Sequence, residues 1–343
     1  MNNKRLKYII PFLAIFIMIC LIFVYNQFFG LRVNPDGEKS TIYIPENASF
    51  DQAMDSVRAN LIIKNQKVFE WVAKKKKYPV LVKPGRYIID KSLSYNEIIN
   101  ILRGGRQTPV MITFSKARTM NDIAGRFGGQ IEADSAGIIS FFSDPGNYNG
   151  DGFKKENIIS VFIPDTYEFY WNTSPEKLYV RMLREYKRFW NKDRLGKSAD
   201  AGLTPTEVSV LASIIDEEAS KQDEKPRIAG VYLNRLKRGI PLQADPTIKF
   251  AINDFTVNRI LYKHLEVDSP YNTYKHSGLP PGPIGCPSVE SIDAVLNAEK
   301  HEYLFFAAKA DFSGYHNFSR TLSEHNRYAN QYQKELNKRR IYR

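Results

Sequence analysis

The chain has 343 residues, which is enough for two or three domains with a sizeable core. Lys and Arg number 49 against 37 Asp and Glu, and the net charge of +12 favours an anionic partner: nucleic acid, a lipid head group or an acidic polymer. The two cysteines, Cys20 and Cys286, lie far apart without a local Cys or His motif, so we expect neither a disulfide nor a zinc site.

An apolar stretch without charges runs from Tyr8 to Phe29. Its length suits a membrane-spanning helix of about 20 residues, and basic residues before it predict a cytoplasmic N-terminus over residues 1–7. No small-residue cleavage site follows, so we expect an uncleaved transmembrane helix over 8–29 rather than a signal peptide or a buried core helix. The rest of the chain should then lie outside the cytoplasmic membrane, which argues against a nucleic-acid partner.

Short strand–turn–helix units follow a polar linker that we expect over residues 30–40. A Ser or Thr with a polar residue three positions later predicts each helix start: Ser49 with Gln52, Ser94 with Glu97 and, more weakly, Thr119 with Asp122. The spacing of these units is irregular, which favours small α+β modules over a solenoid. We assign residues 41–115 to such a module and 116–343 to a larger, mixed α+β region.

Helix signals in the larger region are clear. A helix should begin near Ser174 with Pro175 at its first position, and the aromatic residues just before it, Tyr167, Phe169, Tyr170 and Trp171, are expected in the core. Further helices are predicted over Pro205–Ser220, over Pro226–Arg238 before Gly239, after Ser288 and after "TLSE", and strands in "EYLFFAA" and "HNFS". The predicted fold class is α+β.

Three consecutive acids, Asp216, Glu217 and Glu218, end the helix predicted over Pro205–Ser220. On a helical wheel Glu218 falls near the centre of the apolar face, and Glu217 at its edge. Asp216 falls on the polar side, which it shares with two serines (Ser209 and Ser213). The pattern therefore buries one carboxyl group of the three.

A buried carboxyl group must either find a partner or hold its proton, and a carboxyl that is protonated near neutral pH can serve as a general acid. The wheel leaves two alternatives open. Glu218 could form an ion pair with Arg227 or Arg235 on the next helix. The helix could also end before Glu218 and leave all three acids in water.

Several separated motifs resemble the YceG-like family of endolytic murein transglycosylases. They are "FIPDTYEF", "ASIIDEEA", "VYLNRLKRGIPLQADPTIKFA", "SPYNTYKHSGLPPGPIGCPS" and "EYLFFAAKADFSGYHNFSRTLSEHN", in this order within residues 161–326. The resemblance implies a LysM-like module at 41–115 and a catalytic region at 116–343. The sequence departs from the family pattern at two places: Asp216 stands in the first acidic position, and "IGCPS" stands where Asn-Pro-Gly is more usual.

The resemblance also implies a mechanism. Glu218 matches the family's catalytic acid and would cleave the β-1,4 bond between MurNAc and GlcNAc to leave 1,6-anhydroMurNAc ends, acting first as acid and then as base. Sugar-binding roles are expected, beside structural alternatives, for Gln243, Asp245, Tyr271, Asn272, Tyr274 and His316. No metal or cofactor is expected.

The expected partners are nascent glycan strands, whose stem peptides carry carboxylates that suit the basic chain, and the membrane. Cooperation with peptidoglycan synthases is implied by the resemblance alone. One alternative is a membrane protein that binds peptidoglycan without cutting it. Another is a hydrolase in which Asp245 or Asp216 activates water beside Glu218.

Overall fold

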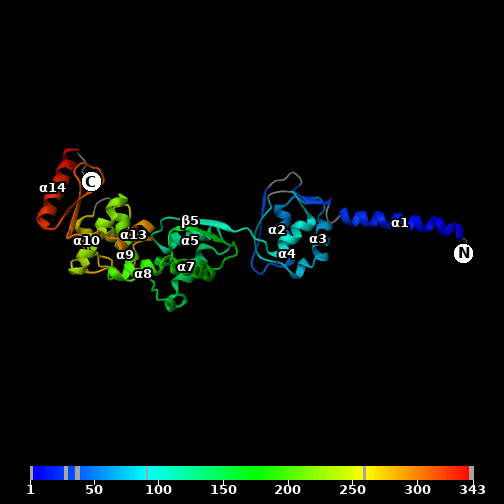
Figure 1. Cartoon of the computed structure of the whole chain (residues 1–343), viewed down its shortest axis with the longest axis horizontal. Helices are drawn as coiled ribbons and strands as arrows, with labels where there is room; N and C mark the ends of the chain where they lie inside the picture. The colour runs from blue at the N-terminus through cyan, green and yellow to red at the C-terminus, as the bar shows by residue number, and fades with distance from the viewer. Residues whose placement is uncertain (1–2, 27–29, 35–38, 90–91, 258–259, 340–343) are drawn as a thin grey trace. The chain divides into compact units, whose positions relative to one another are not determined.

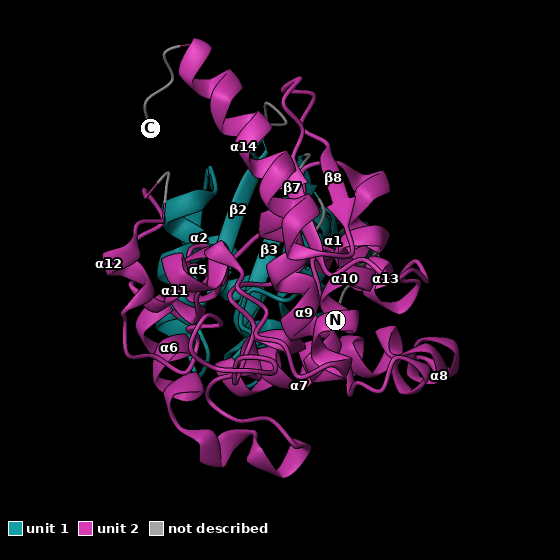
Figure 2. Ribbon diagram, turned by 90° about the vertical axis from the view of Figure 1, so that its left-hand side faces the viewer, with its two compact units in different colours: residues 1–112, 130–133, 168–174 teal, residues 113–129, 134–167, 175–343 magenta. Residues whose placement is uncertain are grey.

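The structure is a computed structural model that describes every residue except 1–2, 27–29, 35–38, 90–91, 258–259 and 340–343 (Figure 1). The chain divides into two compact units. Unit 1 contains residues 1–112, 130–133 and 168–174, and unit 2 contains the remainder (Figure 2). The observed fold is a mixture of helices and short antiparallel strand pairs, and the predicted α+β class is confirmed.

Unit 1 begins with the helix α1, Asn3–Tyr25, whose large apolar side chains from Ile9 to Tyr25 are exposed. The transmembrane helix that we expected over 8–29 includes residues 27–29, which lie outside the described part of the chain. Within the described part, no helix combines the length and the apolar character that crossing a membrane requires.

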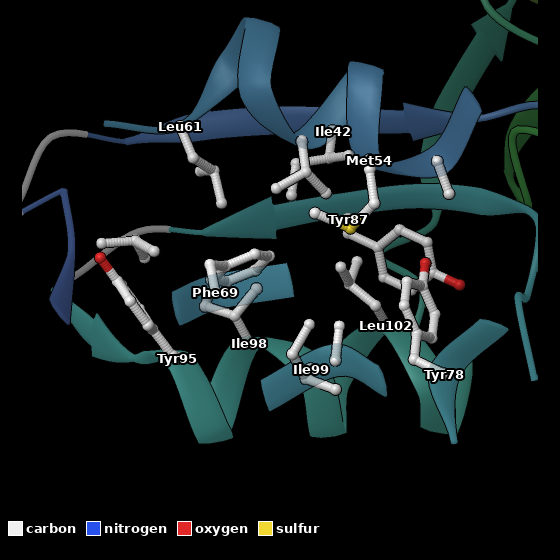
Figure 3. Close-up of a cluster of buried hydrophobic side chains, with 14 of the residues drawn as sticks. Ile42, Met54, Leu61, Phe69, Tyr78, Tyr87, Tyr95, Ile98, Ile99 and Leu102 are labelled. Carbon is white, nitrogen blue, oxygen red and sulfur yellow. The ribbon is translucent and has the colours of Figure 1, made fainter. Parts of the chain in front are cut away.

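The rest of unit 1 is a small α+β module with its own core. The elements are β1 (Arg32–Val33), β2 (Ser40–Ile44), α2 (Phe50–Asn60), α3 (Gln66–Lys75), β3 (Gly85–Ile89), β4 (Leu93–Ser94) and α4 (Tyr95–Gly104). Strand β2 pairs with β3 and β1 with β4, both antiparallel. The predicted capping boxes at Ser49 and Ser94 are present and begin α2 and α4. Figure 3 shows the buried cluster between helices and strands, in which Ile42, Phe69 and Ile98 are fully buried.

The unit boundary crosses the strands β5 (Val110–Phe114) and β6 (Asp165–Phe169), which pair with each other. The helix α5 (Met120–Gly128) begins with a full capping box at Thr119 and Asp122, and α6 (Ser135–Ser143) follows. Helix α7 (Pro175–Phe189) starts with Pro175 as predicted. Of the aromatic residues expected in the core, Tyr167 and Phe169 are buried, but Tyr170 is 56% exposed, so that expectation was wrong for Tyr170.

The remaining elements of unit 2 surround α9. They are α8 (Lys192–Asp200), α9 (Pro205–Glu218), α10 (Lys225–Lys237), α11 (Asp245–Ala251), α12 (Tyr262–Leu265), α13 (Val289–Leu296), β7 (Phe305–Ala308), β8 (His316–Ser319) and α14 (Leu322–Lys338). Helices α8, α10, α11 and α13 pack against α9, while β7 pairs with β8 and packs against α10 and α14. Figure 2 shows α9, α10, α13 and α14 together in magenta. Strands β7 and β8 are present where strands were predicted, and β7 is half-buried.

Candidate active site

Helix α9 ends with the three consecutive acids, and its apolar residues belong to the buried core of unit 2. Its start is fixed by Thr204, whose hydroxyl accepts the backbone N–H of Glu207 while the Glu207 side chain accepts the N–H of Thr204. Every residue from 208 to 215 is buried. The helix ends at Glu218, so this carboxyl group is held at the end of a rigid, enclosed rod, where the negative end of the helix dipole also disfavours its ionised form.

Asp216 is tied into a buried polar cluster. Its Oδ1 lies 2.9 Å from Lys225 Nζ and accepts hydrogen bonds from the hydroxyls of Ser288 (2.6 Å) and Ser291 (2.5 Å). Burial opposes ionisation, but these two hydrogen bonds and the Lys225 ammonium together hold the pKa of Asp216 below its usual value. The helical wheel placed Asp216 on the polar side of the helix, away from the one buried carboxyl group, and this expectation was wrong because Asp216 is largely buried. Helix α9 is enclosed on all sides, and Ser209 and Ser213 are buried as well.

Glu217 is the surface member of the three. Its carboxylate lies 2.5 Å from Lys116 Nζ and 3.3 Å from Arg118 Nη2, and all three side chains remain partly exposed. Ion pairs of this exposed kind contribute little to stability. Glu217 thus satisfies its charge at the surface and is no candidate for a proton donor.

Glu218 is half-buried, and its only hydrogen bond within the described structure is accepted by Oε1 from the hydroxyl of Tyr232 at 2.9 Å. Burial and the nearby charge of Asp245 raise its pKa to about 7, although the Tyr232 hydrogen bond and the charge of Lys249 act in the opposite direction. A pKa near neutrality allows Glu218 to exchange a proton at neutral pH.

The two alternatives left open by the wheel are not observed. Arg227 pairs with Glu299 at 2.9 Å, and the guanidinium of Arg235 donates to the carbonyl oxygens of Pro241 and Leu304. Glu218 makes no ion pair within the described residues. Helix α9 extends to Glu218, which is half-buried rather than free in water. The carboxyl group is thus unneutralised and poised near neutral pH, which is the usual property of a general acid.

A pocket of about 380 Å³ opens at Glu218, and all of its lining residues belong to unit 2. Of the residues predicted to bind sugar, Gln243, Asp245 and Tyr274 line this pocket with Glu218. The Tyr274 hydroxyl donates a hydrogen bond of 2.5 Å to Asp245 Oδ1. We call this cavity the Glu218 pocket.

Three other predicted residues lie outside the lining of the Glu218 pocket. The ring of Tyr271 packs on Phe250, with centroids 4.7 Å apart. Asn272 is fully buried, and its Nδ2 donates to two backbone carbonyl oxygens of the preceding loop at 2.8 and 2.9 Å. His316 Nδ1 lies 2.9 Å from the buried carboxylate of Glu224. These contacts hold the loop and β8 in place.

Sequence reasoning missed three polar residues of the Glu218 pocket: Tyr232, Arg235 and His325. Tyr232 and Arg235 lie on α10, one turn apart, and His325 lies on α14. Among the described residues, the buried Nδ1 atom of His325 has no hydrogen-bond partner, and burial followed by the Arg235 charge lowers the pKa of His325, which keeps it neutral near pH 7. The motifs "VYLNRLKRG" and "TLSEHN" contain all three residues, so the signal was present. No group of three or more His, Cys, Asp or Glu side chains that could hold a metal ion occurs in the described part of the chain.

A carboxyl group with a raised pKa in a polar, partly aromatic pocket is the arrangement of an acid–base enzyme. The sequence model of the YceG-like family matches residues 42–331, which include most of both units and the whole Glu218 pocket, and the chain belongs to this family.

Relatives of named activity support this membership. An endolytic murein transglycosylase of Bacillus subtilis (strain 168) is 30% identical over 329 residues, covering 90% of this chain and 89% of that protein. One from Streptococcus pneumoniae serotype 2 is 28% identical over 302 residues, 78% of this chain but only 54% of the longer relative. A crystal structure of a YceG-like protein from Listeria monocytogenes covers 84% of this chain and 98% of its own, with 28% identity and a TM-score of 0.56.

Proposed function

We propose that this protein is an endolytic murein transglycosylase that cleaves the β-1,4 bond between MurNAc and GlcNAc inside a glycan strand and leaves 1,6-anhydroMurNAc ends. The observation that carries the proposal is Glu218, at the end of α9, with a pKa of about 7 in a pocket large enough for a sugar ring. The relatives' shared activity points to the same reaction.

One carboxyl group is sufficient for this chemistry. The Tyr232 hydroxyl holds Oε1 of Glu218, which leaves Oε2 to carry the proton toward the glycosidic oxygen. After that bond breaks, the Glu218 carboxylate takes the proton of the MurNAc 6-hydroxyl, whose oxygen attacks C1 of the same sugar. Because this nucleophile is tethered to the reacting ring, orientation replaces the second carboxylate of most glycosidases.

Hydrolysis is the second candidate, because Asp245 lines the same pocket as Glu218 and could activate a water molecule. Asp216 is unsuited to that role, since Lys225, Ser288 and Ser291 occupy its carboxylate. Hydrolysis would give reducing ends, which are heavier than anhydro ends by one water molecule. Mass spectrometry of the products therefore separates the two reactions.

The decisive experiment compares Glu218→Gln with Glu217→Gln on purified glycan strands. Loss of the general acid should lower the rate of anhydro-end formation by roughly 10²- to 10⁴-fold, whereas the neighbouring surface acid should keep the wild-type rate. Strands that bind to the wild type without any new ends would favour the non-catalytic binding protein. Equal rates for the two variants would remove Glu218 from the mechanism.

We further propose that the apolar stretch Tyr8–Phe29 holds the enzyme at the cytoplasmic membrane, with the LysM-like module (41–115) and the catalytic region on the outer side. The exposed apolar side chains of α1 and the basic residues before them support this placement. There the enzyme would meet nascent strands beside peptidoglycan synthases and end their elongation.

A further inference from the structure

Arg235 lines the Glu218 pocket together with Glu218 and Gln243. Its side chain is 5% exposed, yet its guanidinium is well satisfied. Nε and Nη2 donate to Pro241 O at 2.9 and 2.7 Å, and Nη1 donates to Leu304 O at 3.0 Å. Nη2 donates a further hydrogen bond of 2.5 Å to Oε1 of Gln243. The buried charge is thus used to orient one amide side chain.

The contact with Arg235 determines which way the Gln243 amide points. A guanidinium has N–H donors and no acceptor, so the amide atom that faces it must be the carbonyl oxygen. The amide nitrogen, Nε2, is then directed away from Arg235, and it donates to no described residue. Gln243 also lines the Glu218 pocket and is exposed. It therefore offers two N–H donors to a bound molecule.

The backbone of Gln243 supports a functional role for this side chain. Its φ is +52°, in the left-handed region that glycine adopts without strain and that other residues occupy at an energetic cost. The chain is held there by hydrogen bonds from Gln243 N to Thr273 O and from Ala244 N to Thr273 Oγ1, both 3.0 Å long. Strain at a pocket residue is often retained where the side chain is required.

Apolar side chains also line the Glu218 pocket. Leu242, Leu304 and Phe305 line it together with Gln243. An amide donor beside an apolar wall matches an acetamido group, which has a carbonyl oxygen to accept a hydrogen bond and a methyl group to bury. We propose that Arg235 and Gln243 form a site that recognises the 2-acetamido group of the glycan, an inference that rests on the proposed function.

The same arrangement disfavours a sugar with a free 2-amino group. An ammonium has only donors, so it would face the Gln243 amide donors without an acceptor, and it would stand beside the Arg235 cation. Asp245 lines the same pocket, but one of its two carboxylate oxygens, Oδ1, already accepts a hydrogen bond from Tyr274, and His325 is neutral. The enzyme should therefore discriminate between N-acetylated and de-N-acetylated strands.

The test uses the full chain and two preparations of glycan strands of equal length, one N-acetylated and one with free 2-amino groups. The wild type should cleave the acetylated strands with a kcat/KM that is at least roughly tenfold higher. Gln243→Glu keeps an oxygen toward Arg235 but turns the donor into an acceptor, so it should lower kcat/KM for acetylated strands by roughly 10- to 100-fold and erase or reverse the preference. Gln222→Glu, an exposed residue outside the pocket, is the matched control.

Binding measurements separate this inference from the proposed function. Calorimetry with Glu218→Gln and an N-acetylated or de-N-acetylated GlcNAc–MurNAc tetrasaccharide reports recognition without cleavage. Preferential binding without anhydro products from the wild type would support acetamido recognition and overturn the lytic reaction. Cleavage of both strand types with equal kcat/KM would overturn acetamido recognition and leave the lytic reaction standing. If Gln243→Glu kept the wild-type preference for N-acetylated strands, acetamido recognition would also be overturned.

Discussion

Neighbouring acids in one short run of sequence have opposite electrostatic surroundings. Asp216 is surrounded by one ammonium and two hydroxyl donors, and its pKa falls, whereas Glu218 has one hydroxyl donor and loses water, and its pKa rises to about 7. Asp216 and Glu218 are only two positions apart, but they lie on different faces of the helix and meet different hydrogen-bond donors. The difference favours a charged carboxylate at Asp216, and it leaves a proton on Glu218 that the proposed reaction would use.

The hydroxyl of Tyr232 should set the pH range of the reaction. In the proposed reaction Glu218 must be protonated before the bond is cleaved, so kcat/KM should decrease as the pH rises above about 7. The Tyr232 hydrogen bond favours the carboxylate, and its removal in Tyr232→Phe should move this decrease upward by about one pH unit. The pH profile of anhydro-end formation measures the shift.

Tyr179→Phe is the control for this profile, because the Tyr179 hydroxyl donates to Asp151 and does not line the Glu218 pocket. It should keep the wild-type profile. A Tyr232→Phe profile that moves to lower pH, or not at all, would contradict the role of this hydrogen bond. A uniform loss of rate without any shift would mean that Tyr232 only shapes the pocket.

At the level of elements, α9 is held to α10 and α13 by the buried pair Asp216–Lys225 and the two serines. The side chain of Lys225 is 5% exposed, so it depends on its partner for a counter-charge. Asp216→Asn leaves this ammonium buried without one and should lower the free energy of unfolding of unit 2 by about 3 kcal/mol. Adding Lys225→Met removes the stranded charge and should restore part of that loss.

Urea unfolding can report on unit 2 alone if Trp71 and Trp171, which belong to unit 1, are replaced by Phe. The remaining Trp190 lies in the buried cluster around α9 and gives the fluorescence signal. If Asp216→Asn combined with Lys225→Met were less stable than Asp216→Asn alone, contacts of Lys225 other than its ion pair with Asp216 would contribute more to stability. A stability change below about 0.5 kcal/mol for Asp216→Asn would show that the pair is dispensable.

Local signals in the sequence predicted the elements well, because a cap or a helix stop depends on residues three or four positions apart. Ser94 with Glu97, and Gly239 after α10, are examples. The wheel also selected Glu218, although it could not show that α9 is enclosed on every side. The partners of Asp216 are up to 75 residues away, so no local pattern reveals them.

The lining of the Glu218 pocket was harder to predict for the same reason. Gln243 lies in the loop before α11. It meets Tyr274 only through tertiary packing, in which α11 and this loop pack against α9. His325 and Phe305 reach the pocket because β7 packs between α10 and α14. A sequence motif can indicate that a residue is important without showing where its side chain points. Asn272 and His316 belong to matched motifs, but neither lines the Glu218 pocket.

For the whole molecule, two features could attract it to a membrane: the apolar stretch Tyr8–Phe29 and the net charge of +12. They can be separated because the stretch carries no charged residue, and its deletion leaves the net charge unchanged. Electrostatic attraction to anionic lipids is screened at 1 M salt, where the Debye length is about 3 Å, whereas apolar burial persists.

We therefore expect the full chain to stay with the membrane pellet after washing with 1 M salt and the variant without residues 8–29 to appear in the soluble fraction. Because the Glu218 pocket lies wholly within unit 2, the deleted form should cleave soluble glycan strands at a rate within about twofold of the full chain. Release of the full chain by salt alone would mean that its basic surface, rather than the apolar stretch, holds it at the membrane.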